Sequence, residues 1–124
     1  MDYDAQQLQD LVVRILTRSI KRKMGLGVPF ETTDEEDTFF RELVKQTTGA
    51  KLNPLMFYFE PMSNKSFSIQ YNSYPIGRIK INGKKSSMQV LKGLNGVKHF
   101  ENLSLDEYIS HIPEWIKHIK YCIK

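Results

Sequence analysis

The sequence has few of the residues that would link distant parts of a chain covalently or anchor it in a membrane. Its one cysteine, Cys122, excludes an internal disulfide. No apolar run reaches the roughly 18 residues of a transmembrane helix. The opening segment, MDYDAQQLQD, has early acidic residues and lacks the apolar core of a signal peptide. These absences favour a reducing, cytoplasmic setting, which a viral or mobile-element protein acting inside a cell would share.

Sequence patterns of catalysis are scarce as well. The segments GLG and GLNG do not match the glycine spacing of a dinucleotide fingerprint or a phosphate-binding loop. Glu60 is the single acidic residue between positions 51 and 100, and no second carboxylate stands at a spacing typical of a nuclease. We therefore expect no cofactor, and an enzyme is the least favoured class of protein.

Metal-ligating residue types are few and poorly spaced. His111, His118 and Cys122 would share one flank of a helix. A zinc site usually shows paired CxxC or HxxxH ligands, and neither pattern occurs in the sequence. A half-buried position at the margin of a core explains this flank better, so we expect no metal site.

The composition is that of an ordinary globular protein. The chain has 124 residues, of which 40% are hydrophobic and 26% are charged. These values are typical of one folded domain with a buried core. We expect a single domain over residues 1–124.

Two amphipathic helices are expected in the first part of the chain. From about Asp4 to Met24, apolar residues recur at helical spacing. The segment TTDEEDTFFRELVKQTTGA starts again with a capping box, in which Thr33 is followed by Glu36, and it ends at Gly49. The acidic residues at its start suit the positive end of the helix dipole.

The pattern then changes to the alternation typical of β-strands. We expect four antiparallel strands in meander order: LMFYFEP (55–61), SFSIQY (66–71), IGRIKI (76–81) and KKSSMQVL (84–91). The pair Asn82-Gly83 fits a two-residue type I′ turn between the last two strands. The following segment, KGLNGVKHFEN, is expected to be a loop.

The last segment, SLDEYISHIPEWIKHIKYCIK, predicts a helix with a second capping box at Ser104 and Glu107. Pro113 lies inside its apolar stripe, so the helix is either kinked there or ends near His111 and starts again. The stripe keeps its phase through the proline, which favours a kink or a very tight break. The expected fold is a two-layer α+β domain with a four-stranded antiparallel meander sheet, in the order α-α-β-β-β-β-α.

The net charge of +4 is distributed unevenly. Residues 51–100 carry eight basic side chains and one acidic side chain, whereas residues 31–50 carry two basic and six acidic ones. Charge asymmetry of this kind is informative about binding partners rather than about the fold. It favours an anionic partner for the central segment.

Two basic clusters supply the candidate binding residues, one in the predicted hairpin and one at the end of the first helix. The candidate nucleic-acid-binding residues are Arg78, Lys80, Lys84, Lys85, Arg18, Lys21 and Arg22. Alternation places the first two on one face of a strand. Exposed strands also carry lysine for solubility, and helix C-termini carry cations that suit the dipole, so each cluster has a purely structural explanation.

Two functions of different class follow. The first is a small non-enzymatic module that binds DNA or RNA through the basic hairpin and the basic end of the first helix. The alternative is a protein-interaction module, such as an inhibitor or regulatory subunit of the kind a mobile element encodes, that docks on an acidic partner or self-associates. Basic residues of the first helix and the hairpin on one continuous face would favour the first function. Scattered basic residues and an exposed apolar patch would favour the second.

Overall fold

The computed structural model describes residues 4–24, 32–82, 85–92 and 96–123. Its first elements are α1 (Ala5–Met24), α2 (Asp34–Gly49) and the 3-10 helix η1 (Pro54–Met56). The strands follow as β1 (Phe57–Pro61), β2 (Phe67–Tyr71), β3 (Tyr74–Lys80), β4 (Ser87–Lys92) and β5 (Gly96–Glu101). The last elements are α3 (Leu105–Ser110) and α4 (Ile112–Cys122).

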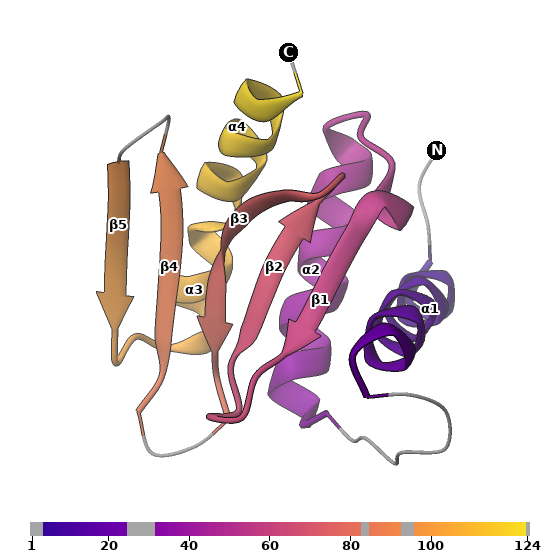
Figure 1. The fold of residues 1–124 in the computed structure, drawn as a ribbon, viewed down its shortest axis with the longest axis horizontal. Coiled ribbons are helices and arrows are strands. Elements are labelled where there is room, and N and C mark those ends of the chain that lie inside the picture. Colours follow the sequence, from indigo (N-terminus) through magenta and orange to yellow (C-terminus); the bar gives the residue numbers. More distant parts are fainter. Residues whose placement is uncertain (1–3, 25–31, 83–84, 93–95, 124) are drawn as a thin grey trace.

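The strands form one antiparallel meander sheet in the order β1-β2-β3-β4-β5. Helices α2, α3 and α4 lie against one face of this sheet, and α1 runs beside β1 and α2 (Figure 1). The predicted α+β class and the antiparallel meander are therefore confirmed.

The number of strands was predicted wrongly. The sheet has five strands instead of four, because β5 lies within the segment expected to be a loop. Its residues are exposed except for the partly buried Phe100, so the sequence shows little hydrophobic alternation there. The element order is accordingly α-α-β-β-β-β-β-α-α rather than α-α-β-β-β-β-α.

The connection between β3 and β4 is also longer than predicted. A two-residue turn at Asn82-Gly83 would pair Lys80 with Lys85, whereas Lys80 pairs with Ser87. Gly83 itself lies outside the described residues. The tight turn is found one hairpin earlier, where Asn72 and Ser73 have φ of 50° and 71° between the paired Tyr71 and Tyr74. Positive φ at both central residues is the geometry of a type I′ turn.

The predicted capping boxes and the break near Pro113 are confirmed. Thr33 and Glu36 cap α2 reciprocally, and Ser104 and Glu107 do the same for α3. His111 alone separates α3 from α4, and Pro113 stands in the first turn of α4. Proline is favoured there because its missing N–H would have no partner within the helix.

The core lies between the sheet and the helices and is rich in aromatic side chains. Phe40 of α2 stacks on Phe59 of β1, with ring centroids 4.6 Å apart. Trp115 of α4 is fully buried, and its Nε1–H donates a 2.9 Å hydrogen bond to the Gln89 carbonyl of β4. Gly77 makes this approach possible, because a Cβ there would lie 2.6 Å from Trp115 Nε1. Among the described helices, none combines the length and the apolar character needed to cross a bilayer.

Candidate nucleic-acid interface

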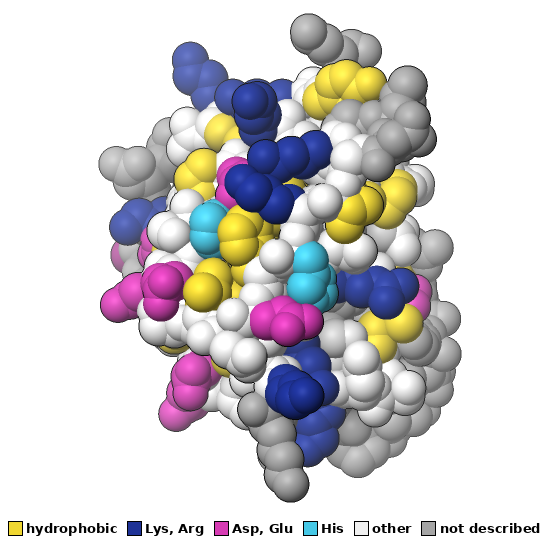
Figure 2. All heavy atoms as spheres, turned by 90° about the vertical axis from the view of Figure 1, so that its left-hand side faces the viewer, with side chains coloured by type: hydrophobic (Ala, Val, Ile, Leu, Met, Phe, Trp, Pro, Cys, Tyr) yellow, Lys and Arg dark blue, Asp and Glu magenta, His cyan; other side chains and the backbone are white. Residues whose placement is uncertain are grey.

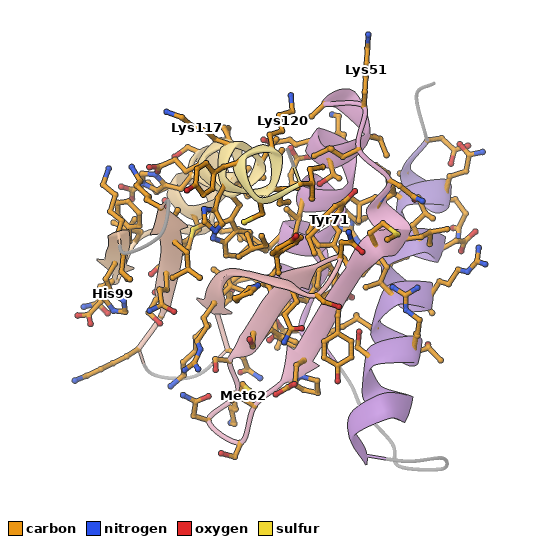
Figure 3. The ribbon with its side chains drawn as sticks, turned by 45° about the horizontal axis from the view of Figure 1, so that its top comes forward. Lys51, Met62, Tyr71, His99, Lys117 and Lys120 are labelled. Carbon is orange, nitrogen blue, oxygen red and sulfur yellow. The ribbon has the colours of Figure 1, made fainter. Side chains whose placement is uncertain are left out.

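The face of the sheet opposite α2, α3 and α4 is the first candidate surface, and we call it the open face (Figure 1). Side chains alternate along each strand, so the residues between the buried positions point to this side. The open face includes Tyr58, Glu60, Ser68, Gln70, Arg78, Lys80, Ser87, Gln89, Val97, His99 and Glu101. In Figure 3, His99 lies on the far side of the sheet from Lys117 and Lys120, which project from α4.

Arg78 and Lys80 lie where the alternation predicts, two residues apart on the open face of β3. Arg78 is exposed and Lys80 is partly buried. The cross-strand partners of Arg78 are Ser68 on β2 and Gln89 on β4. The guanidinium is therefore flanked by neutral polar side chains that can donate and accept hydrogen bonds.

Arg18 lies at the β1 side of the open face, and its position has a structural role that the sequence did not reveal. Its guanidinium donates hydrogen bonds to the main-chain carbonyls of Leu55 and Phe57. Together with Tyr58 and Gln70 it also lines a hollow of about 270 Å³. Arg18 thus joins α1 to the open face.

The remaining predicted residues are placed less completely. Lys85 is exposed in the connection that precedes β4. Lys84 lies outside the described residues. Lys21 and Arg22 belong to α1, but their side chains are outside the part of the chain that the structure describes. Their predicted contribution stays a prediction.

Acidic residues limit the positive charge of the open face. Glu60 of β1 pairs with Ser68, the cross-strand neighbour of Arg78, and Glu101 of β5 pairs with Ser87. Among the described residues, three cations at this face (Arg18, Arg78 and Lys80) stand against these two carboxylates. The excess is modest, and any polyanion that binds here needs hydrogen bonds in addition to charge.

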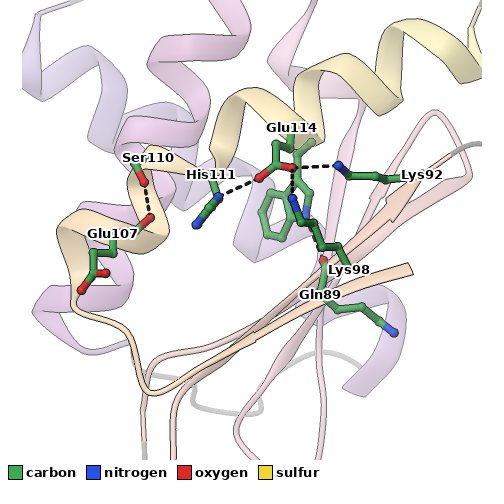
Figure 4. A network of polar contacts seen from close by, with 8 residues as sticks. Gln89, Lys92, Lys98, Glu107, Ser110, His111 and Glu114 are labelled. Atoms are coloured by element: carbon green, nitrogen blue, oxygen red, sulfur yellow. Dashed lines mark hydrogen bonds and ion pairs between the residues drawn. The ribbon is translucent and has the colours of Figure 1, made fainter. Parts of the chain in front are cut away.

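A second charged cluster, which the sequence did not point to, lies between β4, β5 and α4 (Figure 4). The Glu114 carboxylate is 3.1 Å from Lys92 Nζ, 3.6 Å from Lys98 Nζ and 2.7 Å from His111 Nδ1. Burial acts to raise the pKa of Glu114, but the hydrogen bonds of Lys92 and His111 and the charge of Lys98 outweigh it and lower the pKa. The two lysines are far from Glu114 in sequence, so only the fold could reveal this cluster.

His118 and Cys122 form a local pair at the margin of the core. Cys122 Sγ lies 3.3 Å from His118 Nε2, while His111 is engaged with Glu114 instead. Burial raises the pKa of the Cys122 thiol and lowers that of His118. Both shifts favour the neutral forms, which is the opposite of a reactive thiolate–imidazolium pair. No three potential metal-ligating side chains gather among the described residues.

Comparison with known proteins adds no assignment. No protein-family model matches the chain, and neither a curated protein nor a solved structure shows significant similarity to it. The functional argument therefore depends on the surfaces described above.

Proposed function

We propose that this protein binds single-stranded DNA or RNA on the open face of its sheet. The observation that supports the proposal is that Arg18 of α1 and the pair Arg78 and Lys80 of β3 belong to one uncovered side of the sheet. Basic side chains at separated points of one face can follow the phosphates of an extended strand.

The side chains between these cations suit bases rather than phosphates. Ser68, Gln70 and Gln89 offer donors and acceptors that can reach base edges, and Tyr58 presents a ring on which a base can stack. A single strand exposes both base edges and base faces, whereas a duplex hides the faces. This mixture of groups therefore favours a single strand over a duplex.

Fluorescence anisotropy with labelled single-stranded and double-stranded oligonucleotides, at about 50 and 200 mM salt, tests the proposal. We expect the wild type to bind the single strand more tightly, with an affinity that falls as salt rises. The Arg78→Ala/Lys80→Ala variant should make the slope of log K against log salt about 1.4 less negative, since each phosphate contact on a single strand contributes about −0.7.

The matched control removes two lysines from the helix layer. Lys45→Ala/Lys120→Ala changes the net charge equally, but both side chains are exposed on α2 and α4. The control should keep the wild-type slope. An equal loss in both variants would mean that total charge, rather than the open face, determines binding, and absence of binding by the wild type would reject the proposal.

A further inference from the structure

The strand β5 forms an open edge of the sheet. It pairs with β4 and is the last strand in the order of the described sheet (Figure 1). Five of its positions are exposed, and Val97 keeps 58% of its surface accessible. An edge strand presents unpaired N–H and C=O groups that can hydrogen-bond to another extended segment.

The register identifies which backbone groups point outward. The N–H of Asn102 donates to the Ser86 carbonyl, 3.1 Å away, on the continuation of the β4–β5 ladder. Hydrogen-bonded pairs alternate along an antiparallel ladder, so the main-chain N–H and C=O groups of Lys98 and Phe100 point toward β4. The N–H and C=O groups of Val97, His99 and Glu101 therefore point away from the sheet.

The surroundings of this edge are basic near Lys98, whereas Glu101, at the other end of β5, lies 3.0 Å from His99. Lys92 and Lys98 share Glu114, and their side chains remain 50% and 51% exposed. Lys117 of α4 is exposed near Lys92 and Glu114. Figure 2, which views this side of the molecule, shows Lys and Arg side chains gathered in its upper part. One carboxylate does not neutralise three ammonium groups, so the corner attracts an acidic segment.

We propose that β5 binds an extended acidic segment of a partner protein, which adds a sixth strand to the sheet. The segment places an acidic side chain opposite Lys98, on the helix side, and an apolar side chain beside Val97, on the open face. Lys98 can exchange Glu114 for the acidic side chain of the segment, because it is the more distant of the two lysines from Glu114. Main-chain hydrogen bonds supply affinity, and alternate side chains supply specificity.

A second copy of this chain fits the edge less well. When two β5 strands pair through a two-fold axis, the faces of the two sheets match only in registers that place residues of the same face opposite each other. The central registers then place Lys98 opposite Lys98, or His99 opposite His99 with the two lysines in diagonal positions. Like charges at these positions destabilise a strand pair, so an acidic strand is the better partner.

The test uses a labelled peptide of alternating Glu and Val residues as the probe, and a peptide of alternating Lys and Val residues as its counterpart. Fluorescence anisotropy measures binding to the full chain, and amide hydrogen exchange locates it. We expect the Glu-Val peptide alone to bind and to slow exchange at Val97, His99 and Glu101. His99→Pro removes one outward N–H and leaves the ladder to β4 intact, so it should weaken binding about tenfold or more.

Two further variants separate the backbone contribution from the side chains. His99→Ala loses the same imidazole but keeps the N–H, so it should bind within about twofold of the wild type, since it retains every main-chain hydrogen bond. Lys98→Glu should abolish selection of the Glu-Val peptide, and circular dichroism checks that each variant is folded. The proposal is overturned if the Glu-Val peptide does not bind, if both peptides bind equally, or if folded His99→Pro binds like His99→Ala. A dimer in sedimentation experiments that is lost in His99→Pro would assign the edge to a second copy and overturn it as well.

Discussion

The two edges of the sheet are built differently. At β1, the hydroxyl of the buried Ser19 accepts the Phe59 N–H at 2.9 Å, and Arg18 donates to the Phe57 carbonyl. Helix α1 thus supplies hydrogen-bond partners that a neighbouring strand would otherwise provide. At β5, no described element takes this role. Proteins commonly protect sheet edges against unwanted pairing, so a sheet with one covered edge and one uncovered edge is consistent with the strand addition proposed at β5.

The packing beneath the two edges also differs, and it is again more extensive at the β1 edge. Beneath β1 and β2, Phe40 packs against Phe59 and Phe67, with ring centroids 4.6 and 5.0 Å apart. Beneath β5, the partly buried Phe100 stacks on His111 at 3.9 Å, next to the Glu114 cluster. Apolar burial stabilises the half of the sheet at β1, whereas β5, the outer strand of the other half, is attached by a stacked pair and ion pairs. The β5 half should therefore open at a lower free-energy cost.

The largest expected effect tests this difference in packing. Phe40→Ala should lower the free energy of unfolding by about 3–5 kcal/mol, because a buried ring is replaced by a cavity. Phe100→Ala should cost less than half as much, because that ring is only partly buried. Urea denaturation of both variants measures the two losses. Equal losses would show that the two halves are equally well packed.

The next effect concerns the junction between the halves. A Cβ at Gly77 would lie 2.0 Å from the Gln89 carbonyl oxygen, which belongs to the backbone and cannot rotate away. Gly77→Ala should therefore cost about 1–3 kcal/mol or more and separate β3 from β4. Thermal unfolding measures the loss.

Gly49→Ala is the matched control for this substitution, because nothing lies within 4 Å of the added methyl group. Alanine at this position should leave stability unchanged or raise it by up to about 1 kcal/mol, in line with helix propensity. If Gly77→Ala lost no more stability than Gly49→Ala, the close approach of the Gln89 carbonyl and Trp115 would not explain the glycine at position 77.

A smaller effect tests the closed edge directly. Ser19→Ala leaves the buried Phe59 N–H without its partner, which should cost about 1–3 kcal/mol. Exchange of the Phe59 amide proton should accelerate. At the open edge, His99→Ala should stay within about 0.5 kcal/mol of the wild type, since the side chain is exposed. Urea denaturation and hydrogen exchange measure these values, and a comparable loss at both edges would contradict the assigned roles.

The helices and the first four strands could be predicted because their signals are local. A capping box such as Thr33 with Glu36, and the alternation from Phe57 to Phe59, depend on residues a few positions apart. The strand β5 could not be predicted in this way. Of its inward positions, one is Lys98, whose partner Glu114 lies on a helix that comes later in the chain. A charged residue in an inward position removes the hydrophobic alternation that identifies a strand.

In the candidate interface, too, only the features that depend on local sequence patterns could be predicted. Arg78 and Lys80 share a face because of the strand period alone. The contacts of Arg18 join residues 37 and 39 positions apart, and no local pattern indicates them. Likewise, the long connection after Lys80 replaced the predicted turn, because a favourable dipeptide such as Asn82-Gly83 does not by itself determine the register of two strands.

The smallest expected effect concerns the cluster that ties the open edge to α4. The pKa of Glu114 is lower in the folded protein than its ordinary value of 4.5, so the unfolded chain binds a proton more readily. The stabilisation from Glu114 is therefore complete above pH 4.5 and is lost as the pH falls through the lowered pKa. Glu114→Gln should cost about 1 kcal/mol or less at neutral pH and should flatten the acid limb of the stability curve.

Hydrogen exchange as a function of pH distinguishes this local effect from general acid unfolding. Protonation of Glu114 releases Lys92, Lys98 and His111 together, so the amides of β5 should lose protection at a higher pH than those of β1. Glu107→Gln is the comparison variant, because this carboxylate caps α3 but does not contact β5. In Glu107→Gln, the β5 amides should lose protection at the same pH as in the wild type. In Glu114→Gln, their protection should no longer depend on the titration of this carboxylate. If β1 and β5 lost protection at one pH in all three proteins, the sheet would open as a single unit, and the contrast between its edges would concern hydrogen bonding alone.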